Sequence, residues 1–100
     1  MTCDFHPEAR QDYSEAAAWY EEQRVALGDE FIAAVEAALG VIMRDPQRFQ
    51  PVDGPVRIFR LKRFPYYLYF EHQPVGERVR IYAVAHHRRR PGYWQDRFRA

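Results

Sequence analysis

The spacing of apolar residues changes once along this chain of 100 residues, from a helical period to alternation. Residues 7–44 carry apolar side chains every three or four positions, as one face of an amphipathic helix requires. From residue 56 onward apolar and polar side chains alternate, as in strands that bury one face. Three prolines and Gly54 lie between these parts, in residues 46–55. The sequence therefore predicts helices first, a rigid connector, and strands after it.

The helical part is predicted to form two helices joined by a tight connection. We expect the first over about residues 7–24 and the second up to the proline-rich connector. Residues 25–28 form a short link, which favours an antiparallel pair of helices. Gly28 or Asp29 is the expected cap of the second helix. Trp19 lies off the centre of the apolar stripe, so we expect it to pack at the border of the core.

The second half is predicted to be an antiparallel meander. Strands are expected over residues 56–63, 66–71 and 78–85, and a short extended piece over residues 2–5. These elements predict one α+β domain spanning residues 1–100, in the order β-α-α-β-β-β. The helical hairpin would cover one face of a roughly four-stranded, mainly antiparallel sheet. The other face would be freer and would carry arginine and tyrosine side chains.

Alternation in the last strand assigns its side chains to two faces. It places Val79, Ile81 and Ala83 on one face and Arg80, Tyr82 and Val84 on the other. His86 and His87 are consecutive, so they are expected to point to opposite faces and are poorly placed to share a metal. Cys3 is the only cysteine, which excludes an internal disulfide and favours an idle thiol. We expect neither a metal nor another cofactor.

Charge is distributed unevenly along the chain. Residues 1–50 hold four arginines against ten acidic residues, whereas residues 51–100 hold eleven basic residues against four acidic ones. The basic residues Arg88 to Arg90 follow a strand directly, and Tyr93 and Trp94 come next. Arginine suits recognition of carboxylate or phosphate, so this stretch predicts a surface that docks an anionic partner. The alternative is that acidic helices lie against a sheet whose basic outer face is solvated and needs no ligand.

The amino terminus lacks the features of a secretory signal, and no apolar run approaches the length of a membrane helix. We therefore expect a cytoplasmic protein without a membrane partner.

Several short motifs spread along the whole chain carry a resemblance to a known family. They are Pro7, Ala9, Trp19-Tyr20, Gly28, Phe31, Pro46, Arg63-Phe64-Pro65-Tyr66, Ala83-Val84-Ala85-His86, Arg89, Pro91 and Tyr93-Trp94. In combination they resemble the RelE/ParE superfamily of type II toxin–antitoxin toxins. The resemblance is closer to the ParE-like branch, often called plasmid stabilisation proteins. It implies the α+β fold described above and a toxin that halts growth unless a cognate antitoxin wraps a segment around it.

The resemblance implies one of two mechanisms. RelE-like toxins are ribosome-dependent endoribonucleases that cut messenger RNA without a metal, and Arg60, His87 and Tyr93 match their catalytic positions. Two further basic positions of those enzymes are Ile58 and Tyr67 here. Because loss of one preorganised stabilising group costs about 10²- to 10³-fold in rate, these replacements argue against efficient cleavage. ParE-like toxins instead bind DNA gyrase and have no catalytic residues, so we predict a binding inhibitor and no enzyme.

The predicted target-binding surface lies at the carboxyl end of the last strand. It comprises His86, Arg88, Arg89, Arg90, Tyr93 and Trp94. Arginine, tyrosine and tryptophan dominate binding energy at protein interfaces, which suits this role. The expected partners are a cognate antitoxin and DNA gyrase, with the ribosome and its messenger RNA as the alternative. A nucleic-acid-binding module without toxicity is a third possibility, based on the arginine run and the aromatic residues.

An antitoxin segment is expected to be acidic and to fold on contact with this basic chain. It would bind either as an amphipathic helix across an apolar groove or as a strand added to the sheet edge.

Overall fold

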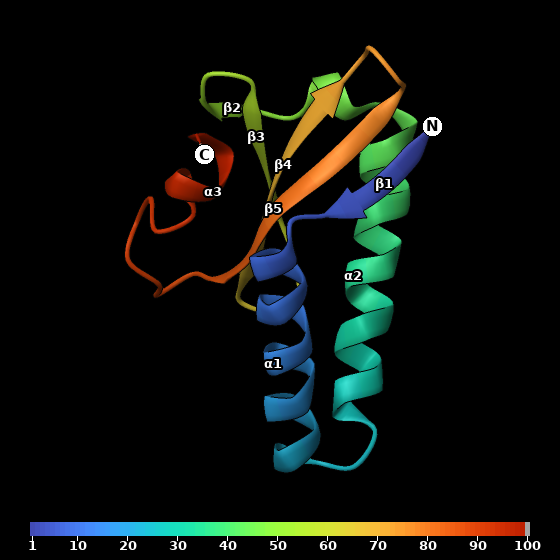
Figure 1. The fold of residues 1–100 in the computed structure, drawn as a ribbon. Coiled ribbons are helices and arrows are strands. Elements are labelled where there is room, and N and C mark those ends of the chain that lie inside the picture. Colours follow the sequence, from blue (N-terminus) through green and yellow to red (C-terminus); the bar gives the residue numbers. More distant parts are fainter. Residues whose placement is uncertain (100) are drawn as a thin grey trace.

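Two long helices and a five-stranded sheet make up most of the computed structural model, which describes residues 1–99 (Figure 1). The elements in chain order are β1 (Thr2–Phe5), α1 (Pro7–Gln23), α2 (Leu27–Arg44), the 3-10 helix η1 (Pro46–Arg48), β2 (Pro51–Asp53), β3 (Val56–Arg60), β4 (Tyr66–Gln73), β5 (Arg78–His86) and α3 (Gln95–Arg99). The strand order is β1-β5-β4-β3-β2. Only the β1–β5 pair is parallel within the described sheet. The predicted α+β class is confirmed, with β2 as an additional strand in the stretch predicted to be a loop.

The helical hairpin covers one face of the sheet and buries an aromatic and aliphatic core. Figure 1 shows α1 and α2 side by side and antiparallel, as predicted. The buried face of α2 consists of Phe31, Val35, Ala38, Leu39 and Ile42, the residues that recur at helical spacing. Phe31 lies at the centre of this core, and its ring centroid is 5.2 Å from those of both Tyr20 and Phe64. Trp19 contacts Tyr20 at the border of the core, as predicted, but remains 55% exposed.

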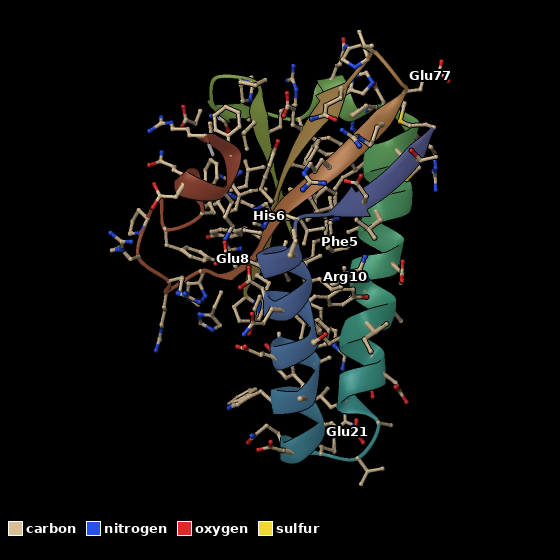
Figure 2. The ribbon with its side chains drawn as sticks, in the orientation of Figure 1. Phe5, His6, Glu8, Arg10, Glu21 and Glu77 are labelled. Carbon is tan, nitrogen blue, oxygen red and sulfur yellow. The ribbon has the colours of Figure 1, made fainter. Side chains whose placement is uncertain are left out.

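The connection between α1 and α2 is capped from the preceding helix. The predicted cap was Gly28 or Asp29, but the N-cap position is Ala26, which has a positive φ of 69° and no side-chain acceptor. Instead the Glu21 carboxylate accepts hydrogen bonds from the amides of Ala26 and Gly28, both at 3.0 Å. Figure 2 shows Glu21 near the end of α1, beside this connection. The Glu21 side chain therefore satisfies N–H groups that would otherwise lack hydrogen-bond partners at the start of α2.

A β-bulge changes which side chains of β5 face the helices. Ala83 pairs with Tyr69 and Ile81 pairs with Phe70, so Tyr82 is an extra residue in β5. Beyond the bulge the alternation is reversed: Val84 packs in the core between helices and sheet, whereas Ala83 lies with Tyr82 on the opposite face. The predicted faces were therefore wrong for both Ala83 and Val84.

The face of the sheet opposite the helices is covered by the carboxyl-terminal segment. A second cluster is formed by Val56, Tyr82, Ala83, Ala85 and Trp94, with Tyr69, Tyr93 and Phe98 packed against it. Figure 1 shows the chain after β5 turning back so that α3 lies away from α1 and α2. The prediction that this face is freer was thus wrong, because the last residues return to bury it. Within residues 1–99 no helix is long and apolar enough to cross a membrane.

Candidate functional site

The predicted surface residues fall into an exposed group and a packed group. His87 and the three arginines Arg88, Arg89 and Arg90 are exposed in the turn that follows β5. None of these arginine side chains forms an ion pair with a residue among positions 1–99. This group, residues 87–90, is called the basic turn below. A run of unpaired guanidinium groups at a strand end is available to an anionic partner.

The two histidines at the start of this turn lie against each other. Their ring centroids are 4.7 Å apart, so the prediction that they point to opposite faces was wrong. The reason is that β5 ends at His86, and a turn in which alternation no longer holds begins at His87. His86 Nδ1 accepts the Arg88 amide at 3.1 Å, and its ring meets Tyr66 edge-on. Burial, followed by the charges of His87 and Arg88, lowers the pKa of His86 below its ordinary value.

Asp12 on α1 ties the carboxyl-terminal segment to the helical layer. Its carboxylate accepts hydrogen bonds from Arg97 at 2.7 Å, from the Tyr93 hydroxyl at 3.2 Å and from the Val84 amide at 3.3 Å. Arg97 also donates to the Tyr82 carbonyl at 3.0 Å. The Asp12 and Arg97 side chains are only 12% and 9% exposed. This shielded network fixes the path of the chain after the basic turn.

Tyr93 and Trp94 take part in packing. The Trp94 side chain is buried, with 3% exposure, and stacks on Tyr69 at a centroid distance of 4.6 Å. The Arg89 guanidinium lies over the Tyr93 ring, 4.1 Å from its centroid. Burial, together with the nearby Asp12 carboxylate, raises the pKa of Tyr93 above its ordinary value. Tyr93 thus holds Arg89 in place, while Trp94 anchors the segment to the sheet.

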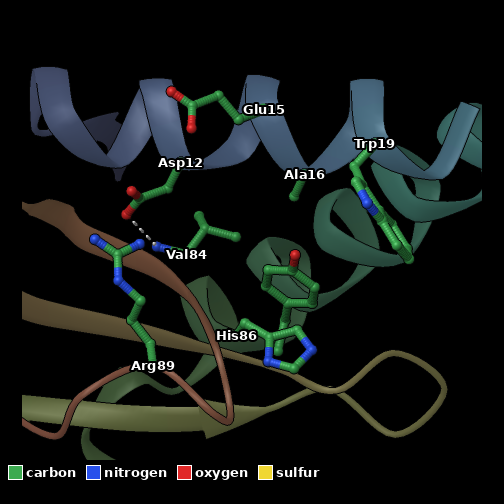
Figure 3. Close-up of a pocket in the computed structure, with 8 residues that line it drawn as sticks. Asp12, Glu15, Ala16, Trp19, Val84, His86 and Arg89 are labelled. Atoms are coloured by element: carbon green, nitrogen blue, oxygen red, sulfur yellow. Dashed lines mark hydrogen bonds between the residues drawn. The ribbon is translucent and has the colours of Figure 1, made fainter. Parts of the chain in front are cut away.

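A cleft of about 210 Å³ lies between α1 and the end of β5 (Figure 3). It is lined by Asp12, Glu15, Ala16, Trp19, Tyr66, Val84, His86 and Arg89. Figure 3 shows α1 along one side of the cleft, with His86 and Arg89 on the other. The bulge in β5 matters here, because it turns His86 toward α1. The cleft therefore joins an acidic helix to the basic turn.

The residues expected in a ribonuclease all lie around Tyr67. Arg60 lies over the Tyr67 ring at 5.7 Å, and His87 lines a small hollow with Tyr67. Tyr93 lines the same hollow, but its hydroxyl donates to Asp12 on α1. Asp12 and Arg97 were missed from the sequence, because they are 85 positions apart and no local pattern links them. In residues 1–99 there is no group of three or more side chains suited to hold a metal ion.

A second recess, called the α2 groove below, runs between α2 and β3. Its apolar part has a volume of about 270 Å³, and a neighbouring part of about 510 Å³ shares Val41, Phe59 and Lys62 with it. Alanines of α2 form much of the apolar wall, and the cationic residues at its rim are Arg48, Arg60, Lys62 and Arg63. Such a groove fits an apolar helix face with acidic flanks.

This fold, with a helical hairpin on one face of a small sheet and a basic turn after its longest strand, is that of a RelE/ParE-like toxin. The family model described as ParE toxin of the type II toxin–antitoxin system parDE matches residues 3–91. The chain therefore belongs to this family.

A solved structure also resembles the chain. The chromosomal ParDE TA system from P. aeruginosa aligns with a TM-score of 0.63 at 16% sequence identity. The match covers 86% of this chain and 95% of that chain. At this identity the likeness concerns the fold alone. A comparison with curated proteins found no match.

Proposed function

We propose that this type II toxin stops growth by binding DNA gyrase through its basic turn, and that a cognate antitoxin neutralises it. The observation that carries the proposal is the exposed, unpaired group Arg88 to Arg90 on a segment held rigid by Asp12 and Trp94. A preorganised cationic surface loses little conformational entropy on binding, which favours tight recognition of a protein partner.

The geometry supports binding more strongly than catalysis. A ribonuclease of the RelE type would need Arg60, His87 and Tyr93 around one phosphate. The Tyr93 hydroxyl instead donates to Asp12, and its raised pKa makes it a poor source of a proton. The ribosome-dependent ribonuclease is therefore the alternative outcome of the experiment below.

The α2 groove is the proposed binding site of the antitoxin. Its wall is apolar, and its rim carries Arg48, Arg60, Lys62 and Arg63, so an amphipathic helix with acidic flanks complements both. The groove lies on α2 and β3, whereas the basic turn follows β5. The antitoxin would then neutralise the toxin in one of two ways. It would either bind only in the α2 groove, away from the basic turn, or extend from the groove to cover the basic turn as well.

Pulse labelling after induction of the toxin without its antitoxin tests the target. We expect DNA synthesis to stop within the first minutes while protein synthesis continues, because gyrase inhibition blocks replication first. An early arrest of translation would contradict the gyrase proposal and favour the ribonuclease, with Arg60, His87 and Tyr93 as catalytic candidates.

Two variants show whether the basic turn carries the effect. The double variant Arg88→Gln and Arg90→Gln is expected to abolish the arrest, since both side chains are exposed and bind nothing else among residues 1–99. The matched control, Arg10→Gln with Arg44→Gln, removes the same charge from exposed helical positions and should leave the arrest intact. Full toxicity of the first variant would exclude these two arginines as the binding surface.

A further inference from the structure

The cleft between α1 and the end of β5 contains hydrogen-bond donors that the chain does not use. The Trp19 indole N–H and the Tyr66 hydroxyl donate to no residue among positions 1–99. His86 accepts the Arg88 amide through Nδ1, so its neutral ring carries the proton on Nε2. Arg89 adds a guanidinium without an ion-pair partner in the described chain.

The acceptors in the same cleft are already engaged. Asp12 receives Arg97, Tyr93 and the Val84 amide, and Figure 3 shows the last of these bonds. Glu15 accepts the Gln11 side chain at 2.8 Å. Apart from the second carboxylate oxygen of Glu15, the free hydrogen-bonding capacity of the cleft is therefore mainly donor capacity. A ligand that satisfies it must supply oxygen acceptors.

The charge balance disfavours a multiply charged ligand. Arg97 neutralises Asp12 in a shielded pair, which leaves Glu15 and Arg89 as the opposed charges at the cleft. Glu15 repels any anion in the cleft, but it repels one carboxylate less than a phosphate of greater charge, so Arg89 can hold a carboxylate more readily. A volume of about 210 Å³ accommodates one side chain, and exposed Trp19 offers an apolar wall for its methylene groups.

We propose that this cleft binds the carboxylate of one aspartate or glutamate side chain from the protein that the basic turn engages. Arg89 supplies the charge-assisted hydrogen bonds, and His86, Tyr66 and Trp19 line the rest of the cleft, where their donors face the remainder of the partner segment. The inference rests on the proposed function, which supplies the partner, and it adds that an acidic side chain of that partner enters the cleft. Tyr93 acts as a positioning residue, because its ring carries the Arg89 guanidinium.

A titration of the isolated protein followed by NMR tests the site. The probes are N-acetyl-glutamate methylamide, the matched N-acetyl-glutamine methylamide, and inorganic phosphate. The Trp19 indole cross-peak should move in a saturable way with the glutamate probe. The glutamine probe should bind at least about tenfold more weakly, since one charge-assisted hydrogen bond is lost.

Two variants of equal charge separate a specific site from general attraction. Arg89→Gln should weaken binding of the glutamate probe by at least about tenfold. Arg90→Gln, which lies in the same turn but does not line this cleft, should change it by less than about twofold. Trp19→Leu should also weaken binding, and the NMR spectrum reports whether each variant is folded.

Four results would overturn the proposal. They are the absence of a saturable Trp19 shift, equal binding of the two amino-acid probes, equal effects of Arg89→Gln and Arg90→Gln, and tighter binding of phosphate than of glutamate. The last result would reassign the cleft to phosphate-bearing ligands. None of them bears on the pulse-labelling outcome, so failure of the cleft and failure of the gyrase target are distinguishable.

Discussion

Asp12 is the residue on which the carboxyl-terminal segment depends most. One carboxylate receives a guanidinium, a hydroxyl and a backbone amide in a shielded position. Asp12→Asn would remove the charge and leave Arg97 unpaired, so we expect the free energy of unfolding to fall by about 3 kcal/mol. Urea denaturation followed by tryptophan fluorescence measures this change.

Glu8 provides the control for that measurement. It lies 3.6 Å from the same guanidinium, but its side chain is 63% exposed. Glu8→Gln should therefore alter stability by less than about 0.5 kcal/mol. Equal effects at Glu8 and Asp12 would show that shielding of the Asp12 pair contributes nothing.

Burial of Trp94 determines how a variant at this position is interpreted. The sequence assigns it to the target surface, whereas its side chain is 3% exposed and stacks on Tyr69. Truncation of a buried aromatic side chain typically costs about 3–5 kcal/mol. Lost toxicity in Trp94→Ala would therefore report disruption of the segment, and it could not by itself identify a target contact.

His86 makes stability depend on pH in a defined direction. Burial and the neighbouring His87 and Arg88 lower its pKa in the folded protein below 6.5, so the folded state prefers the neutral ring. This contribution to stability is complete above pH 6.5 and is lost as the pH falls through the folded-state pKa. We expect wild-type protein to lose more stability than His86→Gln on acidification across this range.

NMR titration of the ring, with urea unfolding on both sides of pH 6.5, checks this expectation. A folded-state pKa at or above 6.5 would contradict it.

The helical hairpin offers a matched pair of glycine substitutions. A Cβ added at Gly28 would lie 2.6 Å from the Ala17 carbonyl oxygen, whereas nothing lies within 4 Å of one added at Gly40. Gly28→Ala should destabilise the protein by about 1–3 kcal/mol, because the two helices must move apart. Gly40→Ala should stabilise it by about 0.5–1 kcal/mol, since alanine favours a helix interior.

Chemical denaturation of both variants measures the change in the free energy of unfolding, which should fall for Gly28→Ala and rise for Gly40→Ala. A stable Gly28→Ala variant would mean that the helices approach less closely than the structure places them.

Regular elements could be predicted from the sequence because their signals are local. The periods of α1, α2 and the main strands follow from neighbouring residues, and their bounds agree with the structure to within three residues. The cap of α2 could not be found in the same way, because Glu21 reaches it from another helix. The bulge at Tyr82 could not be predicted from the sequence, because the alternation predicted for β5 continues through this residue. Only the pairing of β5 with β4 shows the extra residue.

The carboxyl-terminal segment shows the same limit for the site. α3 has five residues and no strong helical pattern of its own. Its position comes from Arg97 bonding to Asp12, a contact across most of the chain. The basic turn was visible in the sequence, but the cleft beside it required the bulge and this long-range contact together.

The whole molecule carries its charges in two halves, and this governs the rate at which a partner finds it. The second half holds eleven basic residues against four acidic ones. An acidic antitoxin segment should be steered toward it, so its association rate should fall at least about tenfold when salt rises from about 50 to 500 mM. Stopped-flow mixing at several salt concentrations measures this rate, and a constant rate would contradict electrostatic steering.

The α2 groove can be tested at the scale of the complex with two valines. Val41 lines both parts of the groove, whereas Val25 is 82% exposed in the α1–α2 connection. Val41→Glu should weaken antitoxin binding by at least about 30-fold, because it places a charge in an apolar contact. Val25→Glu adds the same charge and should have little effect in calorimetry; equal losses would remove the groove from the proposal.

The parallel pairing of β1 with β5 has a consequence for how the protein is made. Residues Thr2 to Phe5 pair with Arg78 to Ile81, so β1 cannot join the sheet until β5 has been synthesised. Helices form from local contacts and precede sheet pairings between distant segments. A ribosome that has not yet released Ile81 therefore holds a helical hairpin whose apolar face is still uncovered. The β1–β5 pairing can therefore form only after Ile81 has been synthesised.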